Sequence, residues 1–255
     1  MDGPDVSRSY WQESRQPVYS AALILPFVVV YEVGIIFLQS NQINGGDAVM
    51  RTLFGRFFNL AGVNISHISV LVLVVFFLFW QARRKGSWRV ESSVLLGSFF
   101  ESLLYAALLF LLLYYLMQYL PHAAASTALA PCAGGVAHRS PALQDFVLYC
   151  GAGVYEELVF RVLLLGLLIL VFTKFFHMEH AYAAAWAVVL GALIFSGFHH
   201  IGGKRFGGEE FSAARFLQRT FAGLYFATIY LNRSYGVAAA SHAFYDILVG
   251  LSLLR

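Results

Sequence analysis

The chain has 255 residues, of which 59% are hydrophobic and only 12% are charged, and its net charge is +3. Soluble domains are about 45–50% apolar and about 25% charged, so this composition excludes a disordered chain, a disulfide-rich secreted scaffold and an ordinary soluble enzyme. The basic residues are scattered, and we expect no nucleic-acid partner. The composition favours an all-α, polytopic membrane protein with the lipid bilayer as its surroundings.

Apolar runs that are long enough to cross a bilayer recur along the chain. A spanning helix needs about 20 mainly apolar residues. Seven runs approach this length, so we expect a transmembrane helical bundle of seven spans, or eight if residues 40–64 or 119–141 hold a re-entrant segment. The fourth run is long enough to be tilted or broken into two pieces. The runs lie at roughly 18–38, 65–81, 93–118, 143–173, 182–200, 213–231 and 235–254.

The polar segments between these runs give the orientation. Residues 39–47 and 202–208 are predicted to be loops. The densest basic loop follows the second run, and the positive-inside rule places it, together with the N-terminus, in the cytoplasm. The compact polytopic form is typical of a bacterial inner (plasma) membrane protein. The basic residues of that loop are Arg83, Arg84, Lys85 and Arg89.

The most informative residues are ionisable ones inside apolar runs, because each costs about 2.5 kcal/mol or more at the centre of a bilayer. Residues 156–161 of the fourth run read Glu-Glu-Leu-Val-Phe-Arg. Glu157 and Arg161 are four residues apart on one helix face, so we expect a structural ion pair. Glu156 lies about 100° further around the helix and is left over, which makes it a candidate general base.

Histidines occur in two further runs. Residues 195–200, at the end of the fifth run, read Phe-Ser-Gly-Phe-His-His, and residues 242–246 of the last run read His-Ala-Phe-Tyr-Asp. His242 and Asp246 are four residues apart and can point at one spot. Each group alone has a structural explanation, such as a hydrogen bond between packed helices. Acid, histidine and histidine–acid groups on three separate helices together indicate a functional site.

These patterns, in this order, resemble those of the CAAX-protease and bacteriocin-processing (CPBP) family of intramembrane endopeptidases. That family carries EExxxR, then FxxxH, then HxxxN or HxxxD on separate transmembrane helices. The resemblance covers residues 143–250. It divides the chain into membrane helices without an assignable motif, residues 1–140, and a family-like catalytic core, residues 141–255. The motifs read Glu156-Glu157-x-x-x-Arg161, Phe195-x-x-x-His199 and His242-x-x-x-Asp246.

The resemblance implies that Glu156 and His199 carry the first step of peptide hydrolysis. Glu156 would be the general base that activates a water molecule, and His199 would hold the same water. Phe195 would pack beside the site.

The resemblance gives the remaining motif residues supporting roles. His242 and Asp246 would line the oxyanion side of the site. Some relatives have Asn in place of Asp246, and an ionised Asp, unlike Asn, cannot donate a hydrogen bond. Glu157 would pair with Arg161 and brace the site.

Taken together, these roles imply an intramembrane endopeptidase that hydrolyses a peptide bond of a membrane-associated protein or peptide. The family is usually regarded as glutamate-type, so we expect no metal cofactor. A zinc site formed by Glu156, His199 and His242 is the alternative. Two other functions stay open: a transporter or ion-binding protein, in which Glu32 and Glu101 would join Glu156 along one route, and a non-catalytic family member that acts as a membrane binding partner.

Overall fold

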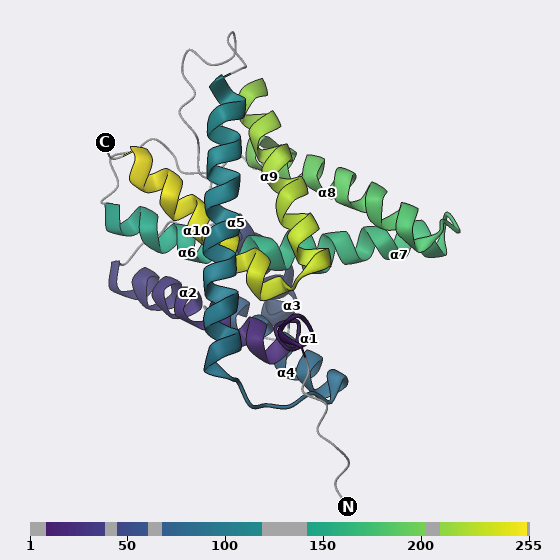
Figure 1. Ribbon diagram of the computed structural model, residues 1–255. Helices are drawn as coiled ribbons and strands as arrows, with labels where there is room; N and C mark the ends of the chain where they lie inside the picture. Colours follow the sequence, from purple (N-terminus) through teal and green to yellow (C-terminus); the bar gives the residue numbers. More distant parts are fainter. Residues whose placement is uncertain (1–8, 39–44, 61–67, 119–141, 202–209, 254–255) are drawn as a thin grey trace, which may run out of the picture.

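The computed structural model describes residues 9–38, 45–60, 68–118, 142–201 and 210–253, which are mostly helical (Figure 1). No strand occurs within these ranges, so the all-α prediction is confirmed for them. The elements are α1 (Tyr10–Glu13), α2 (Pro17–Leu38), α3 (Gly45–Leu60), α4 (Ile68–Arg84), α5 (Ser92–Gln118), α6 (Ala142–Glu157), η1 (Leu158–Leu165), α7 (Gly166–Lys174), α8 (His180–Ile201), α9 (Ala213–Asn232) and α10 (Tyr235–Leu253).

Each of the seven predicted apolar runs coincides with helix. Three of the described helices are long and apolar enough to cross a membrane by length and composition, namely Pro17–Leu38, Ser92–Met117 and His180–Ile201. The count of seven or eight spans therefore stays a prediction. Of the two segments considered for a re-entrant piece, residues 40–64 contain α3, and residues 119–141 lie outside the described part of the chain.

The fourth apolar run is one continuous helical stretch from α6 through η1 to α7, which extends across the molecule (Figure 1). It is not broken. Instead its hydrogen bonding changes to the wider π-helical pattern at Leu158–Leu165, directly after the two glutamates. Short π-helical segments inside α-helices are rare and occur frequently at functional sites. The π-helical segment thus coincides with the part of the sequence that carries Arg161.

Helix α10 packs against α2, α5, α6 and α9 and passes behind α5 at the centre of the bundle (Figure 1). Small residues at helix interfaces let backbones approach closely in membranes. At Gly153 of α6 the approach is so close that a Cβ atom would lie 2.6 Å from the carbonyl oxygen of Ala239. These contacts set the position of α10 and of the motif residues on it. The fully buried small residues of α10 include Ala238, Ala239, Ala240 and Ala243.

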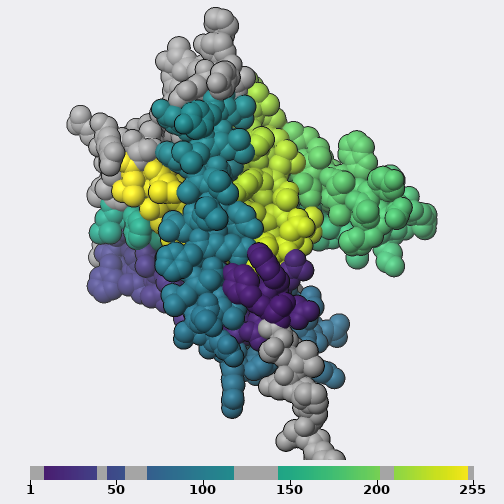
Figure 2. Space-filling view, in the orientation of Figure 1, coloured from purple at the N-terminus to yellow at the C-terminus, as the bar shows by residue number. Residues whose placement is uncertain are grey.

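The hairpin of α7 and α8 projects from the body of the bundle and is the green extension at the right of Figure 2. Its tip exposes Phe175 and Phe176, and α8 exposes Tyr182 and Trp186. An aromatic surface of this kind is unfavourable in water and typical of membrane contact.

We expect Gly153→Ala to lower the stability of the bundle. The added methyl group meets the backbone of α10, and overpacking of this kind costs about 1–3 kcal/mol. Gly166→Ala is the matched control, because a Cβ atom at this exposed position of α7 has no atom within 4 Å; there the gain of about 1 kcal/mol in helix propensity remains. Thermal unfolding in detergent measures both variants, and equal melting temperatures would contradict the close approach.

Candidate active site

The three sequence motifs meet inside the bundle. The first is on α6 and η1, the second on α8 and the third on α10. The seven residues that define the three motifs are all buried, with at most 4% of their surface exposed. Ion pairs, histidine–carboxylate contacts and ring contacts link them across the helices. We refer to them as the motif cluster: Glu156, Glu157, Arg161, Phe195, His199, His242 and Asp246.

Glu157 is held from two sides. Its Oε2 lies 3.0 Å from Nε of Arg161, the ion pair expected from the four-residue spacing. Its Oε1 lies 2.8 Å from Nδ1 of His242, which is on α10. Because a carboxylate only accepts hydrogen bonds, His242 donates in this contact. Glu157 therefore joins η1 to α10, and its two oxygens are already engaged.

Glu156 is in a different environment from its neighbour. Its Oε2 lies 3.7 Å from Nε2 of His199, beyond the about 3.2 Å that a hydrogen bond allows. Among the described residues, neither oxygen of Glu156 has a hydrogen-bond partner, and the same holds for Nε2 of His199. Two buried polar groups from α6 and α8 thus face each other without bonding directly.

The orientation of His199 follows from its other nitrogen. Nδ1 lies 2.8 Å from the backbone carbonyl oxygen of Phe195. A carbonyl oxygen only accepts, so Nδ1 carries the hydrogen, and in the neutral ring the lone pair is on Nε2. An ionised Glu156 and Nε2 of His199 are then both acceptors. A molecule with two donor hydrogens, such as water, can satisfy both.

His242 and Asp246 also lie close together, as their spacing predicts. Nε2 of His242 is 3.5 Å from Oδ2 of Asp246. On one face the imidazole ring stacks on Phe226 of α9, with ring centroids 4.6 Å apart and an interplanar angle of 16°. The two carboxylates and the stacked ring fix the orientation of His242.

Phe195 occupies the middle of the motif cluster. Its ring centroid lies 4.9 Å from that of His199 and 6.2 Å from that of His242. The guanidinium carbon of Arg161 lies 4.6 Å from the same ring centroid, which is within cation–π range. Phe195 therefore packs between the two histidines and the ion pair.

The choice between the metal-free site and the zinc alternative stays a prediction. No group of three or more His, Cys, Asp or Glu side chains in the described part of the chain is placed to hold a metal ion. His242 presents Nδ1 to Glu157 and Nε2 to Asp246. A zinc site needs three protein ligands that converge on one point, and Glu156, His199 and His242 do not form such a group.

The two lone acids of the sequence have structural partners. Glu101 on α5 pairs with Arg233 through both oxygens and accepts a hydrogen bond from Tyr10. Glu32 on α2 accepts a hydrogen bond of 2.6 Å from the hydroxyl of Tyr155. The contacts of Glu101 fasten α1 and α5 to the link between α9 and α10, which is a sufficient reason for its burial. The transport hypothesis gains no support from these contacts.

Helix α3 supports the site, although its first residues were expected in a loop. A Cβ atom at Gly46 would lie 2.5 Å from the backbone nitrogen of Glu156, so α3 touches the motif directly. The adjacent Asp47 is fully buried and accepts hydrogen bonds from Tyr31 of α2, at 2.7 Å, and from Ser69 of α4. The sequence Gly-Gly-Asp at the start of α3 is typical of a loop, so the sequence did not predict that a helix begins there.

Helix α9 contributes buried polar residues that the motif search also missed. Arg219 is 1% exposed and Gln218 is 2% exposed. The side-chain amide of Gln218 donates to the hydroxyl of Tyr245, which adjoins Asp246 in α10. The sequence did contain a signal for Arg219, because an arginine inside an apolar run carries the same insertion cost as the glutamates.

The described helices form a bundle in which buried carboxylates and histidines from three helices lie together. Residues 138–248 match the family described as type II CAAX prenyl endopeptidase Rce1-like. This match supports the CAAX protease family that the motifs predict, over the segment that carries them. Together with the three apolar helices, this makes it an integral membrane protein. Comparisons with curated proteins and with solved structures found no match.

The two adjacent glutamates should differ in their effect on stability. Glu157→Gln leaves the Arg161 charge buried without its partner, and the loss of one partner of a buried pair costs about 3–5 kcal/mol. Glu156→Gln removes a carboxylate that makes no hydrogen bond within the described chain, so stability should be unchanged or higher. Unfolding of both variants in detergent, monitored by circular dichroism, makes the comparison. A larger loss from Glu156→Gln would contradict this assignment.

Proposed function

We propose that the protein is an intramembrane endopeptidase of the glutamate type. It hydrolyses a peptide bond of a membrane-associated protein or peptide with a water molecule that Glu156 and His199 activate. The observation that carries the proposal is the pair of facing, buried groups on α6 and α8, with Oε2 of Glu156 and Nε2 of His199 3.7 Å apart. The family match over residues 138–248 supports the same reaction class.

The hydrogen-bond capacities of the two side chains define the first step. The attacking water donates one hydrogen to the carboxylate of Glu156 and the other to Nε2 of His199, which leaves an oxygen lone pair for the substrate carbonyl. As the carbon–oxygen bond forms, Glu156 takes the proton from the water. Glu156 then delivers this proton to the leaving amine, so the carboxylate is regenerated when the peptide bond breaks.

With Nδ1 donating to Glu157, His242 stabilises the tetrahedral intermediate in its protonated form, in which Nε2 also carries a hydrogen and is the donor. Its ring is fixed by the contacts with Glu157, Asp246 and Phe226, so it requires little reorganisation during the reaction. Loss of one oxyanion donor costs about 10²–10³-fold in rate in other enzymes. Asp246, which cannot donate as an ionised carboxylate, orients His242.

The description of the matching family supports a proposal for the substrate class. The description of the matching family names a CAAX prenyl endopeptidase, and we propose a lipid-modified or otherwise membrane-bound polypeptide as the substrate. We further propose seven spans, a cytoplasmic N-terminus and a place in a bacterial inner membrane. The basic residues in the last turn of α4 and directly after it support this orientation, namely Arg83, Arg84, Lys85 and Arg89.

Replacement of Glu156 should affect cleavage far more than it affects the folding of the protein. We expect Glu156→Gln to reduce hydrolysis by about 10²–10⁴-fold, the typical contribution of a general base, while the variant inserts and unfolds like the wild type. The assay uses liposomes that contain a farnesylated peptide and a set of unmodified membrane peptides, and products are detected by mass spectrometry. Glu32→Gln is the matched control, since it changes another intramembrane glutamate while the amide oxygen can still accept the hydrogen bond of Tyr155.

Two outcomes would contradict the proposal. Normal cleavage by a well-folded Glu156→Gln variant would exclude Glu156 as the base. A loss of wild-type activity with a strong chelator, restored by zinc, would replace the glutamate mechanism with the metal mechanism; we expect the chelator to have no effect.

A further inference from the structure

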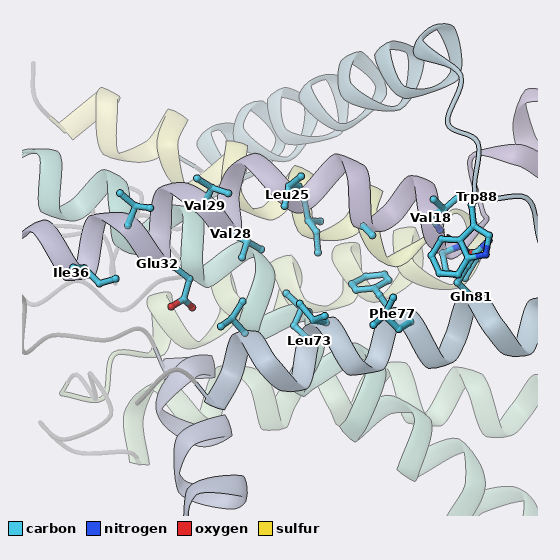
Figure 3. A pocket seen from close by; sticks show the side chains of 17 residues that line it. Val18, Leu25, Val28, Val29, Glu32, Ile36, Leu73, Phe77, Gln81 and Trp88 are labelled. Carbon is cyan, nitrogen blue, oxygen red and sulfur yellow. Dashed lines mark hydrogen bonds between the residues drawn. The ribbon is translucent and has the colours of Figure 1, made fainter. Parts of the chain in front are cut away.

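A long apolar groove separates α2 from α4 on the outside of the bundle (Figure 3). Its volume is about 540 Å³, within the range of about 300–1,000 Å³ that is common for ligand pockets. On α2 it extends from Pro17 to Ile36, which corresponds to about 28 Å of helix. It is lined almost entirely by aliphatic and aromatic side chains, and Leu25, Val29 and Val74 are about half exposed along it.

The two ends of the groove differ. At one end Gln81 and Trp88 lie close together beside Val18, and at the other end the carboxylate of Glu32 points into the space between the helices (Figure 3). Gln81 accepts a hydrogen bond from the backbone of Val18 and donates one to Ser87. The exposed indole of Trp88 is typical of the boundary between hydrocarbon and water.

A second, polar pocket adjoins the end of the groove at Trp88. It has a volume of about 300 Å³ and shares Pro17 with the groove. Two exposed arginines line it, Arg15 from the link between α1 and α2 and Arg84 from the last turn of α4. No acidic residue lines this pocket. Arg15 also donates to the backbone carbonyl of Asn232, which restricts its position.

The combination defines the ligand chemistry. A cationic pocket selects an anionic group, and arginine binds phosphate oxygens in a bidentate manner. A groove that leads from this pocket along a helix apolar enough to span a membrane selects a hydrocarbon chain. A free phosphate satisfies only the pocket and a neutral hydrocarbon only the groove. An anionic phospholipid satisfies both, and basic pockets between membrane helices bind such head groups in other proteins.

We propose that this surface is a specific binding site for one anionic membrane phospholipid. The phosphate lies between Arg15 and Arg84, the glycerol backbone lies near Trp88, and one acyl chain follows the groove between α2 and α4 toward Glu32. The site is separate from the motif cluster, and binding does not require the proposed peptidase activity. Glu32, at the far end of the groove, nonetheless accepts a hydrogen bond from Tyr155, the residue before Glu156. This end of the groove is therefore one hydrogen bond away from the backbone that carries Glu156.

The first test measures lipid-dependent stability of the full chain in a neutral detergent. A ligand that binds only the folded state raises the melting temperature. We expect phosphatidylglycerol to raise it more than phosphatidylcholine with the same acyl chains, and inorganic phosphate to have no effect. Native mass spectrometry should show one retained phosphatidylglycerol per chain. Equal shifts with both lipids, or a shift with phosphate alone, would overturn the proposal.

Charge-matched variants locate the head group. Arg15→Gln with Arg84→Gln should abolish the preference for phosphatidylglycerol, whereas Arg83→Gln with Arg89→Gln removes two charges from outside the pocket and should preserve it. Arg84→Gln alone keeps the contact of Arg15 with Asn232 and should reduce the preference at least tenfold in apparent affinity. If the two double variants lose the preference equally, the effect is a general surface charge and the site is refuted.

A steric variant locates the acyl chain. Val74→Trp fills the groove and should remove the retained lipid, while Leu104→Trp, at an exposed position of α5 outside the groove, should leave it bound. If Val74→Trp retains phosphatidylglycerol like the wild type, the chain does not lie in the groove. If a farnesylated peptide stabilises the protein as strongly as phosphatidylglycerol and the arginine variants have no effect, the groove binds hydrocarbon without a head-group requirement, and the proposal fails.

Discussion

The buried carboxylate of Glu157 is the contact on which the arrangement of the site depends. It lies in a place where a charge costs several kcal/mol, and it is stabilised only because Arg161 and His242 meet it from two elements. This double contact fixes the register of η1 against α10 and sets the tautomer of His242. It also uses both oxygens of Glu157, so the neighbouring Glu156 is the glutamate that remains for the proposed chemistry. One charge braces the bundle, and its neighbour can act on a substrate.

The close approach of α10 to its neighbours makes this contact possible. Side chains larger than alanine at Ala239 or Ala243 would hold α10 away from α6, where Gly153 provides the room. His242 and Glu157 are then brought within 2.8 Å. Small residues at this interface are therefore part of the site, although none of them carries a functional group. The π-helical segment at Leu158–Leu165 directly follows α6 and carries Arg161, which pairs with Glu157 inside the bundle.

The sequence predicted those parts of the structure that depend on local spacing. The helical runs, the pairing of Glu157 with Arg161 and the proximity of His242 to Asp246 all follow from hydrophobicity and from four-residue intervals. The supporting contacts could not be predicted in this way, because they join residues far apart in the chain. Asp47 receives hydrogen bonds from Tyr31 and Ser69, and its polar surroundings in the sequence indicated a loop. Which helices become neighbours is decided by packing over the whole bundle.

The helices without a motif also have a role in holding Glu156, the proposed general base. Gly46 of α3 lies against the backbone of Glu156, and the fully buried Asp47 ties α3 to α2 and α4. Glu32 of α2 holds the hydroxyl of Tyr155. The backbone on either side of the Tyr155–Glu156 bond is thus supported by two elements outside the matched segment. A general base must keep its position to within a fraction of an ångström to be effective. Residues 9–118 are therefore expected to determine how well the site works, and the family segment to determine which reaction it performs.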